Sequence, residues 1–385
     1  MTRTDTLVDS GRILVLTSLV SVLLSVLWIF LADKWDVLAD GKHYMMMYHG
    51  EVARSPFGYR VLTPFLASLL PFDAMTSFAV VTLSSLALTS GVLMLYAESA
   101  KLPGSARMAV FLFWVTSFPY LYYGTTFVRA DGLMFLTIAL VILLSRFKVS
   151  SLVLMVLLSI GTLAHEMVMI VIPALWLDRV FSGTLTGGRH YDYRQLLLIT
   201  IGTLSFYVLT RLVVQTSESP EPTYLKSPVE MFFYALEYSG GAVKHILRVY
   251  ASFGPIFLFS LFYVVFVRRN ARDALVYFGL LVTVFAATFL ATDTLRVMAI
   301  FFLPVMTYAG YFIYFAGSKG SRMVPIFMVL LQVLYSSIVY FNLRTFEGSL
   351  VMNVAAAIIS IIALLVSVWV VRYTPSRHGE MPAEV

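Results

Sequence analysis

The chain leaves its first long apolar run and enters DVLADGKHYMMMYHGEVARSPFGYRVLTPFLASLLP, residues 36–71. This stretch holds two acids, Asp36 and Asp40, and two histidines, His43 and His49, among clustered tyrosines and methionines. The runs on either side of it are almost pure hydrocarbon and are long enough to cross a bilayer. So much polar chemistry in one loop predicts the front wall of an active site at the membrane surface.

The composition of the whole chain is that of a polytopic membrane protein. The 385 residues are 59% hydrophobic and 12% charged, and the mean hydropathy is +0.86. A soluble domain carries about twice that charged fraction. The absence of cysteine excludes disulfides, thiolate metal sites and cysteine nucleophiles. The net charge of +6 does not indicate nucleic-acid binding, because Lys and Arg gather in the cytoplasmic loops of membrane proteins.

Apolar runs long enough to be membrane segments recur along the chain. We expect them at residues 13–32, 74–97, 107–123, 131–146, 195–215, 250–267, 274–292, 297–316, 323–342 and 350–371. The stretch 150–178 is compatible with one long tilted helix that buries a charged pair. It is also compatible with two short helices joined at His165 and Glu166. The distribution of positive charge favours the second arrangement, a short hairpin.

With Arg3 and Arg12 on the cytoplasmic side, this hairpin brings most of the 27 basic residues into short cytoplasmic segments. Few acids lie in those segments, whereas acids outnumber bases in the outer ones. A single crossing at 150–178 would spoil this positive-inside pattern in the second half of the chain. We therefore predict an all-α polytopic membrane protein with about twelve membrane segments, two of which form the hairpin, and with both termini cytoplasmic.

The predicted organisation is a single transmembrane domain over residues 1–372, followed by a cytoplasmic tail at 373–385. Two outer loops stand out. The first, 33–73, holds the candidate active site. The second, 216–249, becomes amphipathic at 229–236, which is typical of a helix at the outer interface.

Charges that the cytoplasmic segments do not account for fall at the outer ends of apolar helices, in four places. They are Asp36, Asp40 and Arg60 in the first outer loop, Arg129 and Asp131 before the fourth span, His165 and Glu166 at the hairpin turn, and Asp293 and Arg296 between two late spans. Ionised groups are costly at such positions unless they face a polar cavity or one another. Four such places on one side predict a shared water-filled pocket.

Each pair also has a purely structural explanation. Asp293 and Arg296 are three residues apart, so they could neutralise each other on one helical face. His165 and Glu166 could cap the hairpin turn and do nothing more. Arg129 and Asp131 are two residues apart and would diverge on a helix, so at least one of them needs another partner. This last pair favours a functional role.

The residues of the first outer loop differ in how strongly the sequence indicates a functional role for them. His43 and His49 are six residues apart with no carboxylate at ligand spacing, so no metal site is assigned to them. The tyrosines and methionines of YMMMYH are typical of an interfacial belt, although aromatic faces also bind sugar rings. Asp40 is the acid that structure alone explains least well. Gly41 beside it permits a tight turn or close approach by a ligand.

At these residues the chain resembles the GT-C superfamily of integral membrane glycosyltransferases. In that family the first outer loop holds an essential acid, and the donors are sugars on a polyprenyl phosphate or pyrophosphate. The resemblance rests on Asp40 to Tyr44 with the following PFGYRVLTPFLASLLP, on RADGLMFLTIAL, on the hairpin GTLAHEMVMIVIPALWL and on TDTLR. It covers the chain up to the end of the hairpin and the TDTLR segment. The DxD or ExD form of some metal-using members is absent, which leaves the need for a divalent cation open and no cofactor assigned.

The resemblance implies a role for each candidate residue. Asp40 would be the general base that deprotonates the acceptor hydroxyl. Arg60, Arg129 and Arg296 would bind the donor phosphate and stabilise it as a leaving group. The residues that would bind or orient the acceptor are Tyr44, Tyr59, Asp131, His165, Glu166 and Asp293. A single base without a nucleophilic partner implies direct displacement with inversion at the anomeric carbon.

The implied function is sugar transfer from a polyprenyl-phosphate donor to a glycan or lipid-linked acceptor. It would take place at the extracytoplasmic face of a bacterial inner membrane, in cell-envelope polysaccharide synthesis. The alternatives are a transporter or flippase for a lipid-linked or polar substrate, an O-antigen-type polymerase or ligase, and a non-catalytic assembly subunit. A transporter is expected to place its charges near the membrane midplane in two matching halves, and neither feature is visible here.

Overall fold

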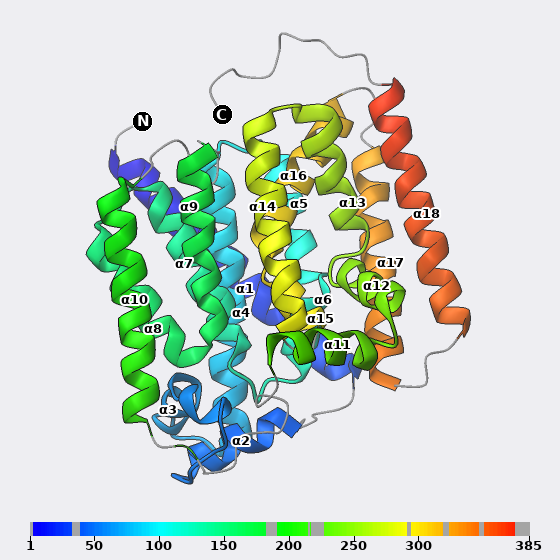
Figure 1. Cartoon of the computed structure of the whole chain (residues 1–385). Helices are drawn as coiled ribbons and strands as arrows, with labels where there is room; N and C mark the ends of the chain where they lie inside the picture. Colours follow the sequence, from blue (N-terminus) through cyan, green and yellow to red (C-terminus); the bar gives the residue numbers. More distant parts are fainter. Residues whose placement is uncertain are drawn as a thin grey trace.

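The computed structural model describes residues 3–32, 39–181, 191–214, 216, 227–290, 294–318, 323–345 and 350–373. These residues form an all-helical bundle without a strand, as the hydropathy pattern predicts (Figure 1). The long helices are α1 (Arg3–Ala32), α4 (Ala74–Ser99), α5 (Gly104–Val115), α7 (Asp131–Arg146), α8 (Ser151–Ala164), α9 (Val171–Phe181), α10 (Tyr193–Val213), α14 (Ala271–Ala287), α16 (Phe302–Ser318), α17 (Met323–Thr345) and α18 (Leu350–Tyr373). The shorter elements are α2 (Ala39–Tyr48), η1 (Phe57–Tyr59), α3 (Leu62–Ser68), α6 (Phe118–Thr125), η2 (Glu166–Ile170), α11 (Pro228–Ser239), α12 (Ala242–Ala251), α13 (Pro255–Phe262), η4 (Tyr263–Arg268), η5 (Thr288–Leu290) and α15 (Thr294–Ala299).

Four helices in the described ranges are long and apolar enough to cross a membrane. They are Ala74–Ser99, Tyr193–Val213, Met323–Tyr340 and Val351–Tyr373. A fifth span results if α12 and the segment Pro255–Arg268, which are bent by 83°, count as one broken helix. The structure thus agrees with a membrane protein, but length and composition do not confirm the predicted twelve segments.

Several predicted spans are interrupted at residues that oppose helix continuation. The run 107–123 is divided between α5 and α6, where Ser117 caps the new helix and a proline stands in its first turn. The run 250–267 is broken before Pro255, because Gly254 adopts a φ of +58° that favours glycine. The run 297–316 is divided between α15 and α16. By contrast, the predicted span 131–146 coincides with α7.

Residues 150–178 form two short helices, as the charge pattern favours. Helix α8 runs toward the lower end of the bundle in Figure 1, η2 makes the turn at Glu166, and α9 returns. Helix α1 begins and α18 ends at the opposite, upper end of the bundle (Figure 1). The lower end carries α2, α3 and the transverse helix α11, which confirms a helix over the predicted amphipathic residues 229–236.

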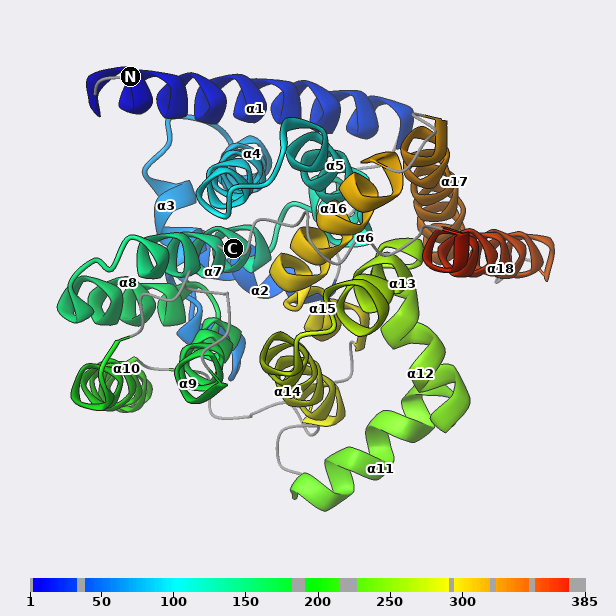
Figure 2. The ribbon, with the colours of Figure 1, turned by 90° about the horizontal axis from the view of Figure 1, so that it is seen from above.

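The core is built around α4 and a cluster of aromatic rings. Viewed from above, α4 lies between α1 and α7, and it contacts both helices (Figure 2). Trp114 of α5 packs against Phe302 of α16 with ring centroids 5.0 Å apart, and against Phe135 of α7 at 5.7 Å. Tyr123 of α6 packs against the same Phe135 at 5.4 Å. These buried rings fix the relative positions of the helices that carry the charged residues.

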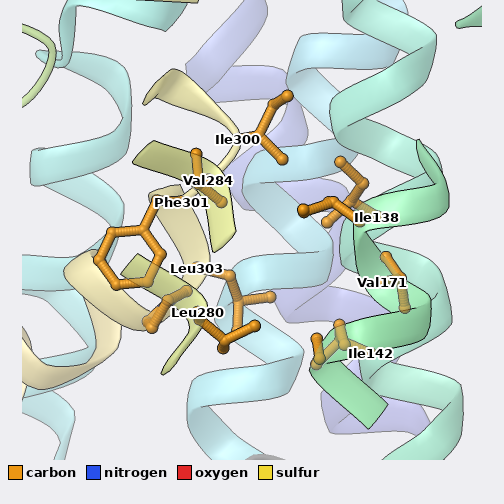
Figure 3. A pocket seen from close by; sticks show the side chains of 11 residues that line it. Ile138, Ile142, Val171, Leu280, Val284, Ile300, Phe301 and Leu303 are labelled. Carbon is orange, nitrogen blue, oxygen red and sulfur yellow. The ribbon is translucent and has the colours of Figure 1, made fainter. Parts of the chain in front are cut away.

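An apolar cavity lies between α7, α9, α14 and α16 (Figure 3). It has a volume of about 30 Å³, and aliphatic side chains, Phe301 and Pro304 line it. Ile138 enters it from α7 and Ile300 from the turn before α16. No charged side chain reaches this cavity, so the polar chemistry of the chain lies elsewhere.

Candidate active site

The candidate base stands at the start of a short helix in the first outer loop. Asp40 lies in the first turn of α2, where free backbone N–H groups favour a negative charge. Helix α2 covers the lower end of the bundle together with α3 (Figure 1). The side chain of Asp40 is 23% exposed, so it is sheltered without being sealed from solvent.

Four charged side chains from three separate parts of the chain meet beside α2. We call Asp40, Arg129, Asp131 and Arg296 the charge cluster. Nη1 of Arg296 donates to Asp40 Oδ2 at 2.5 Å, and Nη2 donates to the two oxygens of Asp131 at 3.2 and 3.0 Å. Nη1 of Arg129 lies 3.6 Å from Asp40 Oδ2. Arg296 therefore bridges two carboxylates, and Asp40 faces two guanidinium groups.

Arg129 has hydrogen-bonding capacity that its described surroundings do not use. Its Nη2 donates to Tyr122 Oη at 3.2 Å, and its guanidinium lies 5.2 Å from the centre of the Tyr122 ring. Nε and Nη1 are buried without a hydrogen-bond partner among the residues that the structure describes. The side chain is only 5% exposed. Buried unsatisfied donors are rare and need an explanation, and an anionic ligand would supply one.

A second group of polar residues lies at the hairpin turn. Arg60 donates through Nε and Nη2 to the two carboxylate oxygens of Glu166, at 2.9 and 2.5 Å, and through Nη1 to Tyr44 Oη at 3.2 Å. All three nitrogens of Arg60 are therefore engaged. His165 Nδ1 accepts from the backbone N–H of Met167 at 3.2 Å and lies 3.7 Å from Glu166 Oε2. We call Tyr44, Arg60, His165 and Glu166 the hairpin cluster.

The local backbone explains how Arg60 reaches Glu166. Arg60 follows directly after η1, and its N–H bonds to the carbonyl of Phe57, which closes a tight turn. Gly58 within that turn has no room for a side chain, because an added Cβ would lie 2.8 Å from the carbonyl oxygen of Ala53 and from Cγ2 of Thr216. The turn therefore packs closely against Thr216, and the side chain of Arg60, which follows it, is buried.

The electrostatics of both clusters fix the charges at neutral pH. Burial raises the pKa of Asp40, but the adjacent Arg296 and Arg129 outweigh burial and hold that pKa below its usual value. Glu166 is subject to the same competition, and the paired Arg60 holds its pKa well below the usual range. Burial, with Arg60 nearby, lowers the pKa of His165 to about 4. Asp40 and Glu166 are therefore carboxylates, and His165 is a neutral ring.

Sequence similarity to known proteins is low. No protein-family model matches the chain, and no curated protein sequence matches it. The matches among solved structures include one of an archaeal protein. That structure is the Archaeoglobus fulgidus oligosaccharyltransferase tethered through a disulfide bond to an acceptor peptide with the NVT sequon. The TM-score is 0.48 and the sequence identity is 12%. The match covers 96% of this chain and 56% of that one. The chain thus spans little more than half the length of that protein, and a likeness at this level defines neither its family nor its substrates.

The structure brings together side chains from all four predicted places. Asp40, Arg129, Asp131 and Arg296 meet in one cluster, and Arg60, Tyr44, His165 and Glu166 meet in the other. Asp36 and Asp293 lie outside the described residues. Tyr59 belongs to neither cluster, because its ring packs against Arg211. The predicted water-filled pocket around these residues stays a prediction.

Two contacts were not foreseen from the sequence. Tyr122 supports Arg129, and no sequence motif marks that residue. Arg211, near the end of α10, lies 4.3 Å from the ring centre of Tyr59 and 4.6 Å from that of Tyr207. An arginine one helical turn after a tyrosine, at the end of an apolar span, was the available signal for this second contact.

The residues present do not fit a divalent cation in the charge cluster. Its two carboxylates, Asp40 and Asp131, are already bridged by the guanidinium of Arg296. Among the described residues, no group of three or more His, Asp or Glu could hold a metal ion.

Proposed function

We propose that this protein is a GT-C-type membrane glycosyltransferase that moves a sugar from a polyprenyl-phosphate donor to an acceptor hydroxyl. The observation that carries the proposal is Arg129, a buried guanidinium with two unpartnered nitrogens in the described structure. One of these nitrogens lies 3.6 Å from the carboxylate of Asp40. A guanidinium with spare donors suits a phosphate leaving group, and a carboxylate beside it suits a general base.

The proposed reaction is a single displacement at the anomeric carbon. The acceptor hydroxyl gives its proton to Asp40, and its oxygen bonds to the anomeric carbon. The bond from that carbon to the phosphate oxygen breaks, and the lipid phosphate leaves with the electron pair. Arg129 and Arg296 stabilise the charge that develops on the phosphate. Attack from the face opposite the leaving group inverts the anomeric configuration.

The remaining residues have supporting roles in this proposal. Asp131 holds the guanidinium of Arg296 from the side opposite Asp40. Each guanidinium nitrogen of Arg60 already donates to Glu166 or Tyr44, so we assign this residue to positioning: with Glu166 it joins the first outer loop to the hairpin turn. Tyr44 is held by this pair. The acceptor side is assigned to Tyr59, His165, Glu166 and Asp293.

The position of the apolar cavity supports a donor with a lipid tail. Ile300 in its wall follows Arg296 by one helical turn, and Ile138 follows Asp131 by two turns on α7. The cavity wall and the charge cluster therefore draw residues from the same two segments of the chain. A phosphate bound at Arg129 and Arg296 would have an apolar seam next to it for a polyprenyl chain.

The decisive experiment is sugar transfer by the purified protein in nanodiscs. A panel of polyprenyl-phosphate sugars is supplied with candidate glycan and lipid-linked acceptors, and release of free polyprenyl phosphate is followed. We expect release from at least one donor, and a product whose anomeric configuration is opposite to that of the donor. Release without inversion would contradict the single displacement. No release from any donor–acceptor pair would contradict the function.

The proposal includes a topology of about twelve membrane segments in a bacterial inner membrane, with both termini cytoplasmic and the charge cluster outside. Because the chain has no cysteine, single cysteines report it directly. Ser68 of α3 is exposed at the end with the charge cluster, and Ser105 of α5 is exposed at the other end. We expect Ser68→Cys to react with an impermeant maleimide in intact cells, and Ser105→Cys to react only after permeabilisation. The reverse pattern would place the cluster in the cytoplasm.

A further inference from the structure

The candidate base is bound in a way that opposes its own function. Asp40 Oδ2 accepts a hydrogen bond from Arg296 at 2.5 Å and lies 3.6 Å from Nη1 of Arg129. A carboxylate held by two guanidinium groups is a weak proton acceptor. Catalysis at Asp40 therefore requires that something reduce the hold of the arginines.

The charge balance of the site identifies what can do so. The charge cluster contains two carboxylates and two guanidinium groups, so it is neutral when empty. A phosphate group adds negative charge, and Arg129 has unused donors in the described structure to receive it. The phosphate would then compete with Asp40 for Arg296, which stays anchored on its other side by Asp131 at 3.0 Å. Excess negative charge in a sheltered site favours protonation of a carboxylate.

The other titratable groups around Asp40 do not offset this change. Arg60 and Glu166 form a closed pair. His165 is neutral, and Tyr44 donates or accepts without charge. Asp131 carries a negative charge of its own and keeps its hydrogen bonds to Arg296. Asp40 has the most exposed carboxyl of the charge cluster, at 23% against 1% for Asp131, so it is the group that can exchange a proton.

We propose that Arg296 restrains Asp40 in the empty site, and that binding of a lipid phosphate transfers Arg296 from Asp40 to the phosphate. Asp40 then becomes a competent base only when a donor is present. After sugar transfer, the site holds a lipid phosphate and a protonated Asp40, whose proton came from the acceptor hydroxyl. This inference rests on the proposed function and adds the coupling between donor binding and the base.

The test measures binding of a lipid phosphate, which is a product of the proposed reaction. Farnesyl monophosphate is titrated into the purified full-length protein at pH 6.5, and the heat of binding is measured by calorimetry. The titration is repeated in buffers that differ in ionisation enthalpy. The dependence of the heat on that enthalpy gives the number of protons taken up on binding. We expect the native chain to take up several tenths of a proton more than Asp40→Asn. The phosphate contributes its own protonation in both proteins, and the C=O stretch of a protonated carboxyl in infrared difference spectra distinguishes that contribution from protonation of Asp40. Glu51→Gln, an exposed acid of the same loop, is the matched control and should behave like the native chain.

The outcomes separate the two proposals. Binding with equal proton uptake in the native chain and Asp40→Asn would overturn the coupling and leave the proposed function standing. No binding of farnesyl monophosphate by the native chain would overturn both. If Asp40→Asn fails to fold, infrared difference spectra of the native chain decide: the C=O stretch of a protonated carboxyl should appear on binding, and its absence would refute the coupling.

Discussion

Asp40→Asn is expected to lower the rate of sugar transfer by about 10³-fold while leaving the helical bundle folded. Asparagine has the same shape as aspartate, and its carbonyl oxygen can still accept from Arg296, which donates to Asp40 at 2.5 Å. It cannot accept the proton of the acceptor hydroxyl. A loss of that size corresponds to about 4 kcal/mol of transition-state stabilisation. The measurement is kcat for release of polyprenyl phosphate, with thermal unfolding in detergent as the check on folding.

Asp131→Asn is the informative comparison for this variant. Asp131 is buried in the same cluster and contacts the same arginine, at 3.0 and 3.2 Å, but it does not face Arg129 within salt-bridge distance in the described structure. We expect a smaller loss of kcat, because Asp131 holds Arg296 and receives no proton. If Asp131→Asn were inactive while Asp40→Asn kept substantial activity, Asp131 would be the base.

The helices were predictable from the sequence wherever a run of apolar side chains is long enough to cross a membrane. Runs of apolar residues predict helices in a membrane, because a bilayer leaves backbone groups no other partner. The distribution of basic residues predicted the hairpin at 150–178, because Lys and Arg gather on the cytoplasmic side of a membrane. Hydropathy does not report backbone continuity, however, so it missed the breaks beside Ser117 and at Gly254, where a cap, a proline or a positive φ ends the helix. The count of twelve segments depended on treating such runs as unbroken.

The site was predictable in position and not in its pairings. Ionised side chains at the ends of apolar helices cost free energy unless they contact one another or a polar cavity, so their placement side by side could be inferred from the sequence. The bond between Asp40 and Arg296 joins residues 256 positions apart, and only packing determines such a contact. Sequence reasoning grouped Arg60 with the phosphate ligands, and that role stays a prediction; what it could not foresee is that each guanidinium nitrogen donates to Glu166 or Tyr44. Which nitrogens of an arginine have hydrogen-bond partners depends on tertiary packing, and the sequence does not show it.

That difference between the arginines leads to a second large effect. Arg129→Gln is expected to lower kcat by about 10²-fold or more, since it removes a donor aimed at the leaving phosphate. Arg129→Lys keeps the charge without the guanidinium fork, and it should recover part of the loss. Arg54→Gln, an exposed arginine of the same outer loop, should leave kcat unchanged. The measurement is again release of polyprenyl phosphate, with kcat and KM determined separately.

Stability should separate Arg129 from Arg60. Arg129 buries two donors without hydrogen-bond partners in the described structure, and its ion pair with Asp40 is long, at 3.6 Å, so its replacement should cost less free energy of unfolding than that of Arg60. Arg60→Gln breaks a buried ion pair and leaves Glu166 unpaired, which should destabilise the fold by about 3–5 kcal/mol. If Arg129→Gln lost stability and kept its kcat, Arg129 would be a structural residue. An arginine with unused donors, at 3.6 Å from the carboxylate of Asp40, suits a phosphate that binds and leaves in each reaction cycle.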